Sequence, residues 1–184
     1  MIYPIVAYGD PVLKKKAVDV DKSMDIETLI DDMFETMYNA SGVGLAAPQI
    51  GKSVRLFIMD GGKPDIEDRT PFQRVFINPE IIFEEGEEWA FEEGCLSIPD
   101  VRQDVMRKPN IKIKYFDANW EEHEDEFDSV TARIIQHEYD HVEGILFTDY
   151  LSPMKKRLLK GRLSNISKGK IKVDYLMKFP NRKR

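Results

Sequence analysis

The sequence predicts an α+β fold, in which mixed or antiparallel strands pack around a central helix carrying the pattern H-E-x-x-H, with an amphipathic helix near the N-terminus. Apolar residues recur at helical spacing between 26 and 38, and short apolar segments broken by turn residues run from 55 to 116. A helix-like segment with the histidine pattern follows at 128–143. Strands followed by a central helix favour the α+β class.

Length and composition fit one domain. The chain has 184 residues, of which 42% are hydrophobic, enough to form a core and to exclude general disorder. No apolar run reaches the ~18 residues of a membrane span, and the N-terminus lacks the pattern of a signal peptide. The single cysteine cannot form an internal disulfide and suits a reducing compartment. We therefore expect a cytoplasmic protein without a membrane partner.

The first twenty residues are expected to form an extended arm. A helix is predicted from Ser23, its N-cap, to Ser41, because its apolar residues share one face. These residues are Ile26, Leu29, Ile30, Met33, Phe34, Met37 and Tyr38. Residues 42–49 are expected to form a loop, whose small side chains let the backbone of a ligand approach closely.

Strands are predicted in the middle of the chain. They are expected at 55–59, 75–77, 81–83, 101–105 and 111–116, with a break at Asn78-Pro79 and a hairpin turn at 117–119. Residues 60–73 are rich in Gly, Pro and charge, and are expected to be an exposed, mobile insertion without chemistry. Asp128 or Ser129 is expected to cap the next helix, which stops at Gly144 and buries Val130, Ile134 and Ile135.

That helix carries a possible metal site. His137 and His141 are four residues apart, so both imidazoles can point at one position, and Glu138 lies beside it. Two nitrogens and an adjacent carboxylate can hold a divalent metal ion and accept a proton from its water. Because a surface helix with two solvated histidines would show the same pattern, a third ligand decides between the two interpretations.

The third ligand is expected upstream. Phe147 stands where one extended form of the motif has a histidine, and no glutamate follows Glu143. The candidates are His123, in a very acidic segment, and Cys95. A lone cysteine by itself is usually a small buried apolar residue. Cys95 is preferred beside two such histidines, because a thiolate binds Zn²⁺ or Fe²⁺ strongly and Gly94 lets the backbone come close.

Three sequence strings resemble the motifs of peptide deformylases. They are GVGLAAPQ at 42–49, EGCLS at 93–97 and QHEYDH at 136–141, and they occur in the order found in that family. The resemblance covers roughly residues 1–153. It implies hydrolytic removal of the formyl group from the initiator methionine, with the N-formylmethionyl nascent peptide as partner. It also implies Fe²⁺ as the metal in the cell, with Zn²⁺, Ni²⁺ or Co²⁺ as substitutes.

Roles for individual residues follow from this resemblance and the chemistry. Cys95, His137 and His141 are expected to hold the metal, with Glu138 as general base. The side-chain amide of Gln49 and the backbone N–H of Leu96 are expected to donate to the formyl oxygen as it becomes negative. By position, Val43, Gly44 and Arg102 match residues along the peptide's path, and Ile134 matches the methionine pocket.

Two other functions share some of these features. A metallopeptidase of the H-E-x-x-H type would cut internal peptide bonds. A structural metal-binding module would close the site with a fourth protein ligand, and His123 is the remaining histidine. The first function is tested with an unformylated peptide, and the second by whether metal removal unfolds the chain.

The C-terminal segment differs in charge from the rest. Residues 154–184 hold twelve Lys or Arg and one Asp, a formal charge of +11, so the remaining residues carry −17 of the total of −6. We expect a single catalytic domain at 1–153 and a basic extension at 154–184, helical at 153–163 and β-like or loose beyond. The extension lies on the acidic body, is merely solvated, or contacts ribosomal RNA. Some deformylases are thought to reach the ribosome through a basic C-terminal helix, although residues 167–170 and Pro180 interrupt a helix here.

Overall fold

The computed structural model describes residues 1–61 and 72–182. Within this part the α+β class is confirmed, with three α-helices and mainly antiparallel strands. The helices are α1 (Glu27–Asn39), α2 (Ser129–Glu143) and α3 (Pro153–Ser167). The strands are β1 (Ile5–Val6), β2 (Gly44–Ala46), β3 (Leu56–Asp60), β4 (Gln73–Glu85), β5 (Trp89–Cys95), β6 (Ile98–Arg107), β7 (Asn110–Phe116), β8 (Glu122–Phe127) and β9 (Met177–Lys178). Short 3₁₀ turns lie at Pro11–Lys14, Ala47–Ile50 and Phe147–Tyr150.

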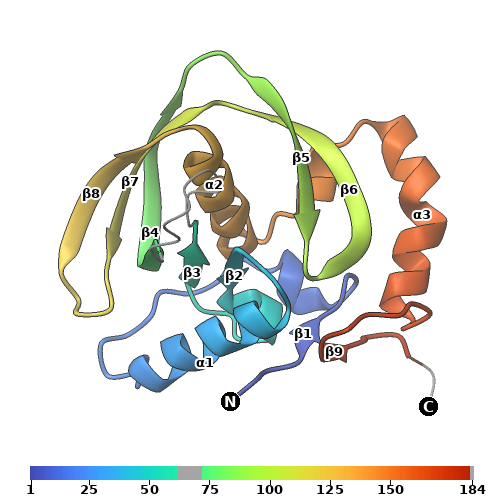
Figure 1. The fold of residues 1–184 in the computed structure, drawn as a ribbon, viewed down its shortest axis with the longest axis horizontal. Coiled ribbons are helices and arrows are strands. Elements are labelled where there is room, and N and C mark those ends of the chain that lie inside the picture. The colour runs from blue at the N-terminus through green and yellow to red at the C-terminus, as the bar shows by residue number, and fades with distance from the viewer. Residues whose placement is uncertain (62–71, 183–184) are drawn as a thin grey trace, which may run out of the picture.

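Helix α2 lies in the middle of the molecule (Figure 1). On one side is a five-stranded antiparallel sheet in the order β2-β3-β4-β7-β8, and α2 packs against β2, β3 and β7. On the other side is the β5–β6 hairpin, whose two-residue turn follows Cys95, since Cys95 pairs with Ile98. The end of this hairpin therefore faces the helix that carries the two histidines.

The N-cap of helix α1 is Ile26, three residues later than expected. The Oδ1 atom of Asp21 accepts a hydrogen bond of 2.8 Å from the N–H of Ser23, and the N–H of Met24 bonds to the carbonyl of Asp21. A short polar side chain thus ties residues 21–24 into a turn that competes with the helix. The expected apolar face is present, and its members Leu29, Ile30, Met33 and Met37 are buried.

Two further elements differ from the expected pattern. Residues 73–85 form one strand, not two separated at Asn78-Pro79. The chain passes this point through a bulge with Asn78 at φ 50°, and the Asn78 side chain is held by both backbone groups of Val20. The expected loop at 42–49 contains strand β2, which forms the sheet edge. The predicted insertion at 60–73 lies mostly outside the described residues.

The buried face of α2 is more polar than expected. Ile135 is buried, whereas Val130 is exposed and Ile134 half-buried. Buried polar side chains include Arg133, Gln136, Glu138, Asp140 and His141. The helix stops at Gly144, which has φ 75° and packs so closely that an added Cβ would lie 2.9 Å from the carbonyl of Lys14. A helix with this many buried polar groups is built around a site as well as a core.

The C-terminal segment folds back onto the body. Helix α3 continues to Ser167, four residues beyond the expected end, and buries only Leu163, Ile166 and Ser167. Strand β9 then pairs in parallel with β1, so the segment is partly β-like, as expected. None of the helices in residues 1–61 and 72–182 has the length and apolar character needed to cross a bilayer.

Candidate metal centre

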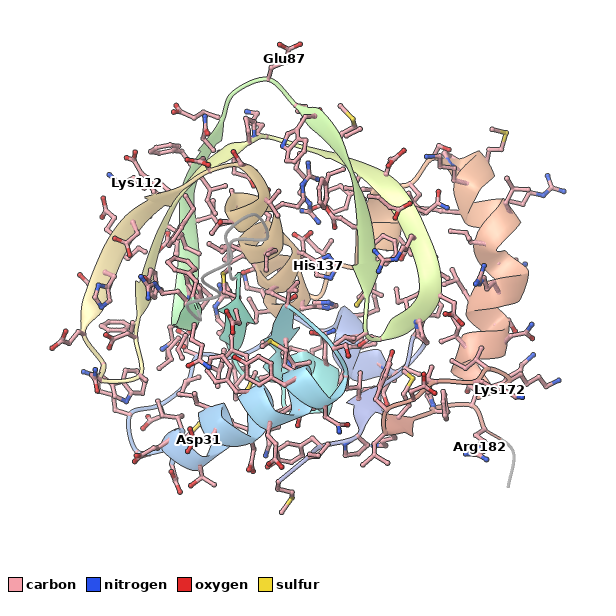
Figure 2. All side chains as sticks on the ribbon, in the orientation of Figure 1. Asp31, Glu87, Lys112, His137, Lys172 and Arg182 are labelled. Atoms are coloured by element: carbon pink, nitrogen blue, oxygen red, sulfur yellow. The ribbon has the colours of Figure 1, made fainter. Side chains whose placement is uncertain are left out.

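Two histidines on α2 and one cysteine from the hairpin turn converge. The ring centroids of His137 and His141 lie 5.1 Å apart, and Cys95 Sγ lies 3.3 Å from His141 Nε2. One ligand atom from each of the three residues fits within a group whose members lie within 4.8 Å of one another. His137 lies in the interior near the middle of the view in Figure 2. The structure therefore brings together all three residues that the sequence suggested as ligands.

The chemistry of this group fits a metal ion. His137 Nδ1 lies 2.9 Å from Glu93 Oε2, and because a carboxylate only accepts, Nδ1 carries the proton and Nε2 is left to bind. A carboxylate behind a histidine is the usual support of a metal ligand. Burial by itself lowers the pKa of His137, but hydrogen bonds with Cys95 and Glu93 reverse this and raise it well above its usual value. The position between these groups thus attracts positive charge.

His141 is also suited to bind a metal ion. Its side chain is buried, and burial, followed by the charges of His137 and Arg107, lowers the pKa of His141 well below its usual value. A neutral imidazole is the form that ligates. A cation bound here would displace the proton from Nε2 of His137, and a thiolate with two neutral imidazoles suits zinc or ferrous iron.

Glu138 is buried beside the three ligands. Its side chain is 4% exposed, and within the described residues its Oε2 atom has no hydrogen-bond partner. Burial raises the pKa of Glu138 to about 7; the charge of His137 opposes this rise, and the charges of Glu93 and Asp140 add to it. A carboxylate with a free oxygen and a raised pKa can accept and return a proton near neutral pH.

The side-chain amide of Gln49 is oriented by the backbone. Its Oε1 atom accepts a hydrogen bond of 2.8 Å from the N–H of Ala46, which turns Nε2 toward the cysteine. Nε2 lies 3.5 Å from Cys95 Sγ and 3.4 Å from Ser97 Oγ. The amide N–H groups of Gln49 are therefore directed at the same region as the ligands, as donors to a developing negative charge.

A buried ion network supports the centre from behind. Glu93 bonds to Arg107 at 2.7 Å and 3.1 Å, and Arg133 donates to it at 3.0 Å. Arg107 also pairs with Asp140 at 2.8 Å. Burial raises the pKa of Glu93, but hydrogen bonds from His137 and Arg107 outweigh burial and hold it well below its usual range. Glu93 therefore stays ionised and orients His137.

The network was not anticipated from the sequence. Glu93 gave one available signal, because residues two apart on a strand share a face and Glu93 precedes Cys95 by two. Nothing in the sequence marked Arg107 and Arg133 as members of the network, since an arginine in a strand or helix is usually exposed.

A cavity of about 590 Å³ opens beside the centre. All four residues suggested for peptide contact line it, namely Val43, Gly44, Arg102 and Ile134. Gln49, Cys95, Leu96, His137 and Glu138 line it as well. His123, the alternative ligand, lies elsewhere, on β8, where its Nε2 is 3.0 Å from Asp117 Oδ2. Apart from His141, the candidate residues thus line one cavity, and His123 takes no part in it.

Comparison with known proteins identifies the family. The family model described as polypeptide deformylase matches residues 2–157. A peptide deformylase of Cytophaga hutchinsonii is 61% identical over 184 residues and covers all of both chains, and one of Christiangramia forsetii is 59% identical, covering 100% of this chain and 99% of the relative. The crystal structure of a peptide deformylase from Legionella pneumophila has a TM-score of 0.81 at 39% identity, covering 92% of this chain and 98% of the other. The chain therefore belongs to the polypeptide deformylase family, the metal-dependent hydrolases that remove the N-formyl group from nascent polypeptides.

Proposed function

We propose that this chain performs the deformylase reaction at the cavity beside Cys95, His137 and His141. The observation that carries the proposal is the convergence of one thiol and two imidazoles within 4.8 Å, next to a buried carboxylate. A divalent metal ion held by these three residues supplies Lewis-acid activation of water, whose pKa falls from about 15.7 to about 7 in favourable sites. The remaining chemistry belongs to the side chains around it.

Glu138 is proposed as the group that moves the proton. Its unpaired Oε2 accepts the proton of the attacking water, and the same oxygen returns it to the amine that leaves as formate is released. Burial raises the pKa of Glu138 to about 7, which suits a group that must both accept and release a proton near neutral pH. Because Glu138 carries out both proton transfers, the reaction needs no separate general acid.

Gln49 and Leu96 are proposed as donors to the formyl oxygen. This oxygen becomes negative when the carbonyl carbon turns tetrahedral, and fixed N–H groups stabilise it without reorganising. Gln49 is held ready by Ala46, and Leu96 follows Cys95 directly in the hairpin turn. Removing one donor of this kind typically costs about 2.7–4 kcal/mol of barrier.

The peptide is proposed to lie along Val43, Gly44 and Arg102, with its methionine side chain near Ile134. Gly44 belongs to the edge strand β2 and is buried, while Val43 and Arg102 are exposed at the mouth. An extended peptide can approach such an edge closely because glycine has no side chain.

We propose Fe²⁺ as the metal in the cell, with Zn²⁺, Ni²⁺ or Co²⁺ able to replace it. The support is the resemblance to the family together with a donor set that suits several of these ions. Protein loaded with iron under anaerobic conditions should release formate and lose activity in air. Equal activity of air-exposed zinc protein would contradict the assignment.

The test of the function is formate release from formyl-Met-Ala-Ser, with the unformylated peptide as control. We expect formate to be released only from the formylated peptide, and release to stop when a chelator removes the metal. Cleavage of an internal bond in the unformylated peptide would instead indicate a metallopeptidase.

We also propose that residues 1–153 supply the metal ligands and the reacting groups, and that the basic helix α3 of the extension 154–184 contacts ribosomal RNA in the cytoplasm. Four exposed basic side chains lie on α3, at Lys156, Arg157, Lys160 and Arg162. Within the described residues, no ion pair joins positions 154–182 to the acidic body, so these charges are available to phosphates. Reversing Arg157 and Arg162 to Glu should weaken cosedimentation with ribosomes at low salt while leaving formate release intact.

A further inference from the structure

The segment after α3 returns to the catalytic cavity. Residues 172–175 line the same cavity as Cys95 and Glu138. They are held there by strand β9, where the N–H of Ile5 donates to the carbonyl of Leu176 at 2.8 Å. Figure 2 shows Lys172 in this segment beneath α3. The family match ends at residue 157, so this wall lies outside the part of the chain that the family model describes.

Tyr175 makes the direct contact with the site. Its hydroxyl donates a hydrogen bond of 2.8 Å to the carbonyl oxygen of Leu96. The N–H of Tyr8 donates at 2.8 Å to the carbonyl of Ser97, the next residue. Both central carbonyls of the turn that follows Cys95 are therefore bound, one by the C-terminal segment and one by the N-terminal arm.

The Tyr175 hydroxyl is held in place and keeps its proton. The residue is half-buried and, like Leu96, packs against the hydrophobic core formed mainly by α1, β2 and β3. Burial raises the pKa of Tyr175 above its usual value, and the charges of Cys95 and Asp100 raise it further. The hydroxyl therefore keeps its proton near neutral pH and can donate it to the Leu96 carbonyl.

We propose that Tyr175 is a positioning residue of the active site, which holds the Leu96 residue so that its N–H points at the formyl oxygen. The N–H and the carbonyl of Leu96 lie in adjacent peptide planes joined at its Cα, so anchoring the carbonyl restricts how far one plane can rotate relative to the other. A donor acts in catalysis only when it is fixed at the place where charge develops. This inference rests on the proposed role of Leu96, and it makes the C-terminal segment part of the catalytic apparatus.

The test is Tyr175→Phe, which removes the hydroxyl and keeps the ring. The matched control is Asn181→Ala, which removes a hydrogen bond of the same segment to Ser167 Oγ, away from the cavity. Both variants and the wild type are assayed on formyl-Met-Ala-Ser and on its thioformyl analogue, whose sulfur accepts hydrogen bonds poorly. Melting temperatures are measured in parallel.

We expect Tyr175→Phe to lower kcat on the formyl peptide about 3- to 10-fold, with KM changed less than about twofold. The ratio of formyl to thioformyl turnover should fall, because the lost stabilisation concerns the oxygen. Asn181→Ala should leave both quantities as in the wild type.

Three results would overturn the inference. The first is an unchanged kcat in Tyr175→Phe, whether or not KM rises. The second is an equal loss of turnover on the formyl and thioformyl substrates. The third is an equal loss in Asn181→Ala. An inactive wild type would instead refute the proposed function, so the two failures are distinguishable.

Discussion

A Cβ atom added to Gly44 would lie 2.5 Å from Oε1 of Glu138 and 2.8 Å from its Cδ. Strand β2 and helix α2 thus meet at this point with no space for a side chain. The Glu138 carboxylate fits there because residue 44 is a glycine. Gly44 lines the cavity and Glu138 is buried behind it. The proposed general base is therefore held in place partly by the backbone of the edge strand that the substrate is proposed to approach.

Gly44→Ala should displace the Glu138 carboxylate. Because a misplacement of about 1 Å can reduce catalysis about 100-fold, we expect a loss of kcat of that order with the metal still bound. The measurement is formate release together with the metal content of the purified variant.

The control for this variant is Gly161→Ala. Gly161 lies in α3 with nothing within 4 Å of an added Cβ, so the same substitution there should leave kcat unchanged and stabilise the helix by up to about 1 kcal/mol. If Gly44→Ala retained full activity, the close contact with Glu138 would have no catalytic consequence.

Glu138→Ala should separate metal binding from turnover. Cys95, His137 and His141 remain, so the variant should bind one metal ion per chain, whereas loss of the proton carrier should lower kcat about 10²- to 10⁴-fold. His137→Ala, by comparison, should lose the metal itself. Substantial activity in a metal-loaded Glu138→Ala protein would remove this residue from its role.

Glu93→Gln should weaken metal binding although none of the three metal ligands is changed. The amide cannot supply the charge that Glu93 gives to His137, and it leaves Arg107 and Arg133 short of a buried counter-charge. Losing such a support typically lowers metal affinity about 10- to 100-fold. Competition with a chromogenic chelator measures this change.

Glu92→Gln is the matched control, one residue away. Its side chain is mostly exposed and pairs only distantly with Arg102, at 3.9 Å. Its metal affinity should equal that of the wild type. Equal affinities in both variants would show that the carboxylate behind His137 does not tune the site.

The parts of the site that could be predicted from sequence are those fixed by local geometry. His137 and His141 lie on one face because of the helical repeat, and Cys95 lies in a short string directly before a turn. Glu93, Arg107 and Tyr175 depend on contacts between segments 14 to 79 residues apart. No local pattern specifies such contacts, so they became visible only in the folded chain.

The same distinction explains where the predicted elements differ from the observed ones. The apolar face of α1 follows from periodicity, but its start was placed too early because the turn at Asp21 depends on one side-chain hydrogen bond. The sequence predicts two strands where the structure has one at 73–85, because Asn78-Pro79 usually ends a strand. Here the pairing of β4 with β3 and β7 carries the chain across a bulge.

Asp117→Ala should lower stability in a pH-dependent way. Asp117 accepts bonds from the N–H groups of Asn119 and Glu121, at 2.9 Å and 3.0 Å, and pairs with His123. Burial raises its pKa, but these hydrogen bonds outweigh burial and lower it below its ordinary value. A carboxyl whose folded pKa is depressed contributes stability that is complete above the unfolded pKa, near 3.9, and is lost as pH falls through the folded pKa.

Urea unfolding at two pH values measures this contribution. At pH 6.5 the variant should be less stable than the wild type by about 1 kcal/mol, and the difference should shrink below pH 4. Asn119→Ala, in the same turn, removes no carboxylate, so its deficit should not depend on pH. A deficit of Asp117→Ala that stays constant down to pH 3 would contradict this account.

Removing the metal should abolish activity and leave the fold largely intact. In residues 1–61 and 72–182, much of the hydrophobic core is formed by α1, α2 and the five-stranded sheet. A catalytic site with three protein ligands adds stability when loaded, since a bound ion favours the folded state by mass action, but it does not create the core. After treatment with a chelator, far-UV circular dichroism should remain native while formate release stops, and adding Fe²⁺ or Co²⁺ without oxygen should restore turnover. Cooperative unfolding on chelation would instead mark the ion as structural, because in such sites the free energy of metal binding is the free energy of folding.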